Sequence, residues 1–201
     1  MSATADFETA VLGGALPAAA EMALREASQS RGEPAAEGAA LMRAMALAPE
    51  HPSVLIALYR NHFYAHRLQP ARAVARRALA VGAVALGLPS VWRDVPARPL
   101  SGARHDAGTR FYLFALKGLA YLSLRLGDEG EARDALALLR ALDPEDRVGG
   151  ALIEAVRQRA EARGQLDADA DADADTEGEV LHTGPLAWAS LRPVPTASSA
   201  A

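Results

Sequence analysis

Apolar residues recur at intervals of three and four along the chain from Ala18 to Arg163, which is the spacing of one face of an α-helix. The pattern is clearest between Arg110 and Pro144, where it forms two consecutive stripes. The first stripe consists of Leu113, Leu116, Leu119, Ala120 and Leu124, and the second of Ala132, Ala135, Leu136, Leu139 and Leu142. Between them, Gly127 favours the left-handed conformation that ends a helix, and Asp128 can cap the next one. This segment therefore predicts a helical hairpin.

The same hairpin pattern occurs twice more towards the N-terminus. In the second copy His66 stands at the turn position of Gly127, and in the first copy Gly32 does. Gly32 and His66 are 34 residues apart, while His66 and Gly127 are 61 apart, which is one period of 34 plus 27 inserted residues. The expected helices of these copies are 18–30, 33–47, 52–65 and 69–86. Ser53 is expected to cap the third of them.

The repeated pattern resembles the tetratricopeptide repeat (TPR), a unit of about 34 residues that folds as helix, turn and helix. The resemblance rests on Gly127 at the turn, Ala132 early in the second helix, ARRAL at 75–79 and the closing RALDPED at 140–146. The chain departs from the family where His66 replaces the turn glycine and where the Trp-Leu-Gly of the first helix is absent. The resemblance implies an all-α helical-hairpin array of three TPR-like repeats that binds peptides or proteins.

Composition shifts along the chain suggest its domain boundaries. We expect an N-terminal extension (1–17), a repeat domain (18–164) and a disordered tail (165–201). The repeat domain ends with a capping helix, because Leu152, Ile153 and Val156 share one apolar face after Pro144, and a repeat array needs a polar-backed final helix. The tail begins with alternating Asp and Ala, which bury too little apolar surface and repel one another too strongly to fold.

The segment 86–112 interrupts the array between the second and third repeats. It contains three prolines and Trp92. Loops of this length inside a compact domain are usually functional or disordered. Two interpretations stay open: a floppy linker between extended helices, or an ordered segment in which Trp92 packs against the domain.

Composition and charge narrow the class of protein. Half of the 201 residues are apolar, aromatic residues are scarce and cysteine is absent, which suits one helical domain and excludes disulfides and cysteine nucleophiles. The tail holds seven acidic residues and one arginine, so the remaining chain, with 20 basic and 18 acidic residues, has a net charge near +2. The N-terminus lacks the basic residues of a secretory signal and no apolar run is long enough to span a membrane, so we expect a cytoplasmic protein without a membrane partner.

Candidate chemistry is sparse. His62 and His66 have the spacing of two zinc ligands on a helix, but no third ligand is nearby, and the Asp series of the tail lacks the glycine-turned cage of a calcium loop. Arg72, Arg76 and Arg77 form a basic stripe without interleaved aromatic residues, so we interpret it as a solvated helix face and expect no nucleic-acid partner. No phosphate loop, nucleophile motif or carboxylate pair appears, so we expect no enzyme, metal or cofactor.

The candidate site follows from the resemblance, which implies that the first helix of each repeat lines a concave groove. The residues expected to bind a partner there are Arg60, Phe63, Tyr64, Lys117, Tyr121 and Arg125. Cations beside aromatic rings suit an extended peptide or protein that carries carboxylates, because charge-assisted bonds orient it and the rings supply contact area. The residue pattern leaves the partner's identity and the oligomeric state open.

A second interpretation is a structural or accessory subunit whose groove is occupied by its own tail or insertion. In that case the acidic residues 167–179 approach Arg60, Lys117 and Arg125, and Trp188 or Leu191 anchors beyond them. The segments FYLF at 111–114 and LPSVW at 88–92 resemble those of small proteins encoded among nitrogen-fixation accessory genes. Such a subunit would assist an enzyme-maturation complex.

Overall fold

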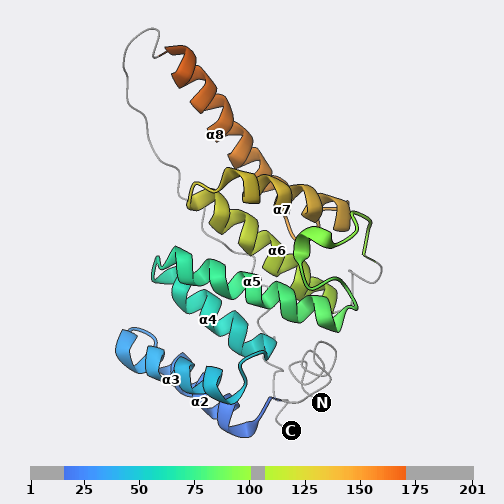
Figure 1. Cartoon of the computed structure of the whole chain (residues 1–201). Coiled ribbons are helices and arrows are strands. Elements are labelled where there is room, and N and C mark those ends of the chain that lie inside the picture. Colours follow the sequence, from blue (N-terminus) through green and yellow to red (C-terminus); the bar gives the residue numbers. More distant parts are fainter. Residues whose placement is uncertain (1–15, 101–106, 171–201) are drawn as a thin grey trace, which may run out of the picture.

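The computed structural model describes residues 16–100 and 107–170, with side chains up to residue 162. Within these residues the fold is all-helical, and six of its seven α-helices form three antiparallel pairs stacked in chain order (Figure 1). The pairs are α2 (Ala18–Gln29) with α3 (Pro34–Leu47), α4 (Pro52–Tyr64) with α5 (Leu68–Ala85), and α6 (Ala107–Arg125) with α7 (Glu129–Leu142). The seventh helix, α8 (Ala151–Ala170), follows the third pair. These helices confirm the expected hairpins.

The turns within the pairs follow from local sequence. Gly32, His66 and Gly127 have φ angles of +100°, +55° and +75°, so each turn uses the left-handed region, which glycine adopts without strain. Asp128 caps α7 by accepting a hydrogen bond from the Glu131 backbone N–H at 3.2 Å. The prediction of Ser53 as a cap is wrong. Instead, Nδ1 of His51 accepts a hydrogen bond from the Ser53 backbone N–H at 3.2 Å, and so caps α4.

The core consists of two clusters of buried apolar side chains, each of which joins helices of successive pairs. The first cluster joins α2 and α3 mainly through alanines, and Val54 and Leu58 of α4 complete it. The second is larger and richer in leucine and aromatic residues, and it joins α4, α5, α6 and α7. The alanine side chains of the first pair let the two helices approach closely but each buries little apolar area. Most of the buried apolar side chains belong to the second cluster.

The described part of the insertion, up to residue 100, packs against the helix pairs. Helix α6 begins at Ala107, so the predicted boundary at residue 112 is wrong: Phe111 and Tyr112 lie within the helix, fully buried. Within the insertion, a 3₁₀ turn, η1 (Trp92–Asp94), packs against α5 and α7, and Trp92 is only 8% exposed. The Leu100 backbone N–H donates a hydrogen bond to the Leu142 carbonyl at 3.1 Å. Of the two interpretations left open, the packed tryptophan is the one observed.

The last helix joins the array only through its beginning. Ile153 of α8 and Val148 in the preceding loop are buried in the second cluster, whereas the far end of α8 projects away from the stacked pairs (Figure 1). The helix continues to Ala170, beyond the expected start of the tail at residue 165. The rest of that tail, 171–201, and most of the N-terminal extension, 1–15, lie outside the described residues. Among the helices in the described ranges, none combines the length and apolar character needed to cross a membrane.

Candidate functional site

Five of the six predicted partner-binding residues lie together on α4 and α6. We call Arg60, Phe63, Tyr64, Tyr121 and Arg125 the aromatic–basic belt. The Phe63 ring centroid lies 5.8 Å from that of Tyr121 and 5.7 Å from that of Tyr64, so Phe63 links the two helices. Contacts at these distances are typical of attractive aromatic pairs.

A guanidinium group lies at each end of the belt. The guanidinium carbon of Arg60 is 5.9 Å from the centre of the Tyr64 ring, and that of Arg125 is 5.8 Å from the centre of the Tyr121 ring. Both arrangements are cation–π contacts between residues one helical turn apart. Arg125 Nη1 also donates a hydrogen bond to the Tyr121 hydroxyl at 2.9 Å. Within the part of the chain whose side chains are described, neither guanidinium forms an ion pair, so both cations remain available to an external carboxylate.

The belt is half buried and half exposed. Tyr64 is 58% exposed, whereas Phe63 is 9% exposed and stacks on the buried Tyr59 with ring centroids 5.8 Å apart. Tyr59 in turn lies against Gly118 of α6, where an added Cβ would be 2.9 Å from the Tyr59 hydroxyl oxygen. Glycine at this position therefore lets α4 and α6 approach closely enough for Phe63 to reach Tyr121.

Lys117, the sixth predicted residue, does not join the belt. Its Nζ donates a hydrogen bond to the Val148 carbonyl at 2.6 Å, in the loop between α7 and α8. Burial lowers the pKa of Lys117, and the carboxylate of Asp146 offsets part of that effect. The ammonium group thus satisfies a buried carbonyl and holds the loop against α6, and it presents little charge to a partner.

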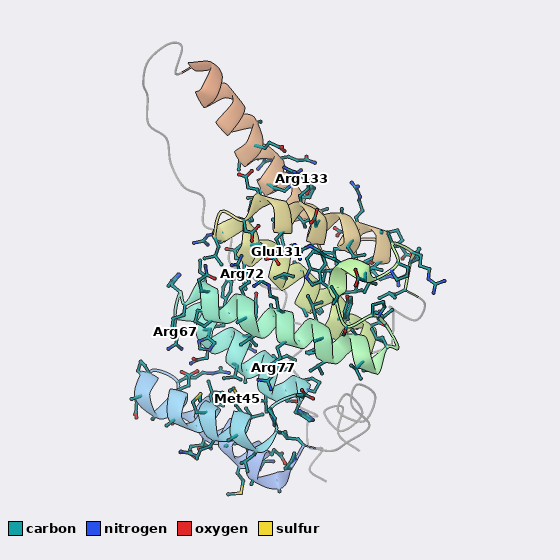
Figure 2. The ribbon with its side chains drawn as sticks, in the orientation of Figure 1. Met45, Arg67, Arg72, Arg77, Glu131 and Arg133 are labelled. Carbon is teal, nitrogen blue, oxygen red and sulfur yellow. The ribbon has the colours of Figure 1, made fainter. Side chains whose placement is uncertain are left out.

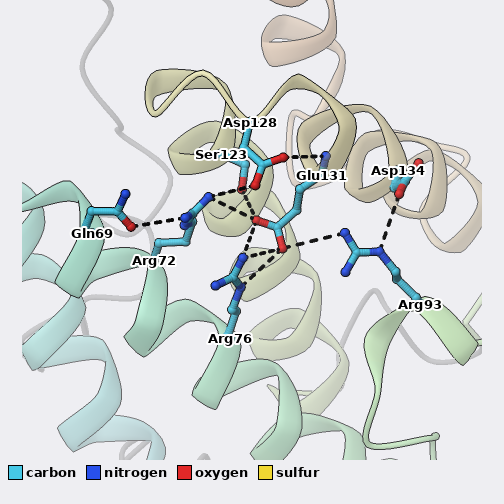
Figure 3. A network of polar contacts seen from close by, with 8 residues as sticks. All are labelled: Gln69, Arg72, Arg76, Arg93, Ser123, Asp128, Glu131 and Asp134. Atoms are coloured by element: carbon cyan, nitrogen blue, oxygen red, sulfur yellow. Dashed lines mark hydrogen bonds and ion pairs between the residues drawn. The ribbon is translucent and has the colours of Figure 1, made fainter.

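A second polar cluster, which the sequence pattern did not reveal, is centred on Glu131 of α7 (Figure 3). The Glu131 side chain is only 3% exposed. It accepts hydrogen bonds from Arg76 at 2.8 Å, from Arg72 at 3.4 Å and from the Ser123 hydroxyl at 2.6 Å. Arg93 of η1 lies 3.9 Å away and also contacts Asp134. We call this set the Glu131 network.

The Glu131 network corrects the interpretation of the basic stripe on α5. Arg72, whose side chain is 13% exposed, and Arg76 point towards Glu131 at the boundary between the second and third helix pairs, so they are not a freely solvated face (Figures 2 and 3). Arg72 is further held by Asp128 at 3.1 Å. Since the carboxylates inside the network already face these guanidiniums, the network is a structural junction of α5, α7 and the insertion. No local signal in the sequence indicated the network, because Glu131 has the position of an ordinary acidic residue in a first helical turn.

The two candidate zinc ligands do not converge on one site. His66 occupies the turn after α4 and is exposed, whereas His62 is partly buried on α4. Burial and the neighbouring Arg67 lower the pKa of His62. Across the described ranges, no group of three or more His, Cys, Asp or Glu side chains is placed to hold a metal ion.

Comparison with known proteins supplies a relative. A protein of Azotobacter chroococcum mcd 1, named "Uncharacterized 19.8 kDa protein in nifW 5'region", is 39% identical over 151 residues, which cover 74% of this chain and 84% of the relative. This chain belongs to the same family as that protein. No family profile and no solved structure matches the chain.

Proposed function

We propose that this protein is a non-enzymatic, TPR-like interaction module whose aromatic–basic belt binds an extended peptide or partner protein that carries carboxylates. The observation that carries the proposal is the belt itself: two guanidinium groups without described ion pairs flank a continuous run of aromatic rings on two successive first helices. Aromatic and arginine side chains dominate binding energy at protein interfaces.

The arrangement of the belt suggests what kind of peptide it binds. A carboxylate beside Arg60 or Arg125 would accept charge-assisted hydrogen bonds, which are about twice as strong as neutral ones. An apolar side chain between the two carboxylates would lie against Tyr64 and Tyr121, which keep part of their rings exposed. We therefore propose a segment with acidic residues on both sides of an apolar one.

Charge reversal within the belt tests this proposal. In the double variant Arg60→Glu with Arg125→Glu, capture of the main partner from the native cell should be lost, because each new carboxylate repels the partner's own. The matched control is Arg31→Glu with Arg159→Glu, which makes the same charge change at two exposed arginines outside the belt. Far-UV circular dichroism should remain helical in both variants. Retained capture by the belt variant, with a helical spectrum, would place the binding surface elsewhere.

The second candidate function is that of an accessory subunit in an enzyme-maturation complex. It is favoured by the name of the Azotobacter relative, which places that protein's gene in the nifW 5' region. In this case the belt's partner is a protein encoded nearby, or the chain's own tail. Identification of the protein captured by the unaltered chain, but not by the belt variant, separates these possibilities.

A further inference from the structure

A cleft of about 570 Å³ lies between α7 and α8, at the end of the stack of helix pairs. Its apolar floor comes from Leu136, Ala137 and Leu139 of α7 and Ala155 of α8. On the α8 side the lining residues are Ala151, Glu154, Ala155, Arg157 and Gln158. The volume is within the range of about 300 to 1,000 Å³ that holds compact ligands.

The cleft lies at a position where successive helices of the stack meet. In each of the three pairs, the first helix packs along a second, antiparallel helix. Helix α8 follows the third pair as α4 follows the first and α6 the second, yet no second helix follows it within the described residues. Where α4 follows α3 and α6 follows α5, the two helices pack directly on one another, whereas the cleft opens between α7 and α8 and is lined by both, so an apolar segment can pack against both helices there.

We propose that the segment from Val180 to Leu191 of this same chain docks in the α7–α8 cleft. Its apolar residues are Val180, Leu181, Leu186, Trp188 and Leu191, and they stand apart from the acidic stretch before them. The proposal concerns a surface distinct from the aromatic–basic belt, and it does not depend on the proposed function.

The length of the intervening chain permits this contact. Helix α8 ends at Ala170, and at a rise of about 1.5 Å per residue its last residue lies ~22 Å beyond Ala155 in the cleft. Residues 171–179 can span up to about 30 Å when extended. A tethered segment that reaches its site has an effective concentration in the millimolar range, so even weak apolar contacts suffice.

Charge at the cleft favours the same occupant. Two arginines of α7 line it: Arg133, which is only 3.8 Å from Glu161, and Arg140, which forms no ion pair of 4 Å or less in the described part of the chain. The lining carboxylates already have partners: Glu154 pairs with Arg157, Asp143 accepts a hydrogen bond from the Val148 backbone N–H, and Asp146 caps the start of α8. The hydrogen bond from Arg157 lowers the pKa of Glu154, and the charge of Arg140 also contributes to that lowering. Figure 2 places Arg133 beside the beginning of α8. The cleft thus offers cations to the connecting segment.

The connecting segment carries the complementary charge. Residues 171–179 contain Asp171, Asp173, Asp175, Glu177 and Glu179 and no cation. Attraction between these carboxylates and the two arginines would guide the apolar segment behind them into the cleft. Because this attraction is screened within ~10 Å at 0.1 M salt, docking should weaken as the salt concentration rises.

Fluorine NMR of the full chain tests the proposal. The chain has two tryptophans, so incorporation of 5-fluorotryptophan gives two signals, and the variant Trp188→Phe assigns them. A peptide of residues 171–201 with the same label supplies the undocked position of the Trp188 signal. In the full chain at low salt, this signal should be displaced from the peptide position and broadened.

A substitution in the cleft floor should release the segment. Ala137 is exposed on α7 and lines the cleft, so Ala137→Glu places a carboxylate on the apolar floor where the segment from Val180 to Leu191 docks. The displaced Trp188 signal should then return to the peptide position. The matched control, Ala73→Glu, makes the same change at an exposed position of α5 and should leave the signal displaced. The signal of buried Trp92 in the same spectra shows whether each variant is folded. If Ala137→Glu does not fold, the double variant Arg133→Ala with Arg140→Ala replaces it as the cleft variant.

Four outcomes would overturn the proposal. The Trp188 signal of the unaltered chain could coincide with that of the peptide, or it could stay displaced in the folded cleft variants. It could instead respond only to Arg60→Glu with Arg125→Glu, which would place the segment on the belt. A displacement that disappears on dilution would show that the cleft receives the segment of a second copy.

Discussion

Replacing Glu131 by glutamine should destabilise the fold, because Glu131 is the centre of a buried charge network. Glutamine preserves the shape of the side chain and one acceptor oxygen, but it removes the negative charge that faces Arg72, Arg76 and Arg93. Since Glu131 is 3% exposed and Arg72 13%, solvent cannot replace the lost charge. Breaking a buried ion pair by removal of one partner costs about 3–5 kcal/mol. We expect a loss of ~3 kcal/mol, because Asp128 still faces Arg72.

Chemical and thermal unfolding, both followed by far-UV circular dichroism, measure this loss as a free energy and as a decrease in Tm. For a domain of this size, 1 kcal/mol corresponds to ~2–4 °C in Tm, so the expected decrease in Tm is about 6–12 °C. The control is Asp134→Asn, which removes a carboxylate that is 58% exposed and 3.5 Å from Arg93. Such an exposed pair contributes less than about 1 kcal/mol.

The comparison of these two variants can refute the reasoning. If Glu131→Gln and Asp134→Asn changed the free energy of unfolding by equal and small amounts, the network would not stabilise the junction of α5, α7 and the insertion. If only Asp134→Asn became more destabilising at low salt, its effect on the free energy of unfolding would come from long-range charge, since exposed pairs are screened by salt and buried ones much less.

Three further predictions concern buried side chains. Tyr112→Phe should increase the free energy of unfolding by ~1 kcal/mol, because the Tyr112 hydroxyl is buried with no hydrogen-bond partner among the described residues and burial raises its pKa to about 12; a decrease would reveal a partner for it. Since burial and Arg67 lower the pKa of His62 below 6.5, the unfolded chain binds the proton more tightly, so stability should fall as the pH drops through and below 6.5, and His62→Gln should remove that part of the dependence. Trp92→Ala should cost about 3–5 kcal/mol and Val91→Ala, at a 55% exposed position, less than about 0.5 kcal/mol; equal effects would show that the insertion does not hold the fold together.

The helix pairs could be predicted because their signals are local. Apolar spacing of three and four marks each buried face, and Gly127 with Asp128 encodes both the end of one helix and the cap of the next. The start of α6 was placed too late because residues 107–112 carry no such spacing towards a single face. Phe111 and Tyr112 are neighbours in the sequence, yet both are buried, because α6 is enclosed on more than one side. The side chains of both lie close to Gly82 of α5.

Contacts between distant residues could not be predicted in the same way. Glu131 has the position of an ordinary acidic residue in a first helical turn, and its partners Arg72 and Arg76 are 59 and 55 residues away in the chain. The hydrogen bond from Leu100 to Leu142, which holds the insertion, likewise has no sequence signature. For the candidate site, the TPR resemblance implied six residues on the first helices, and five of them lie together on α4 and α6. It could not show that the Val148 carbonyl, on a loop, takes Lys117 out of the belt.

The division of the belt between core and surface decides which substitutions can report on binding. Phe63 and Tyr59 are 9% and 3% exposed, and they hold α4 against α6 at Gly118, so their replacement would perturb the fold along with any bound partner. Arg60 and Arg125 rest on the outer faces of tyrosine rings and make no described ion pair, so their replacement removes charge and little packing. A binding loss caused by the arginines therefore reports on the partner, whereas one caused by Phe63 reports on both. The same distinction holds for the cleft. Ala137 is exposed, so its replacement changes the surface of the cleft and little of the packing.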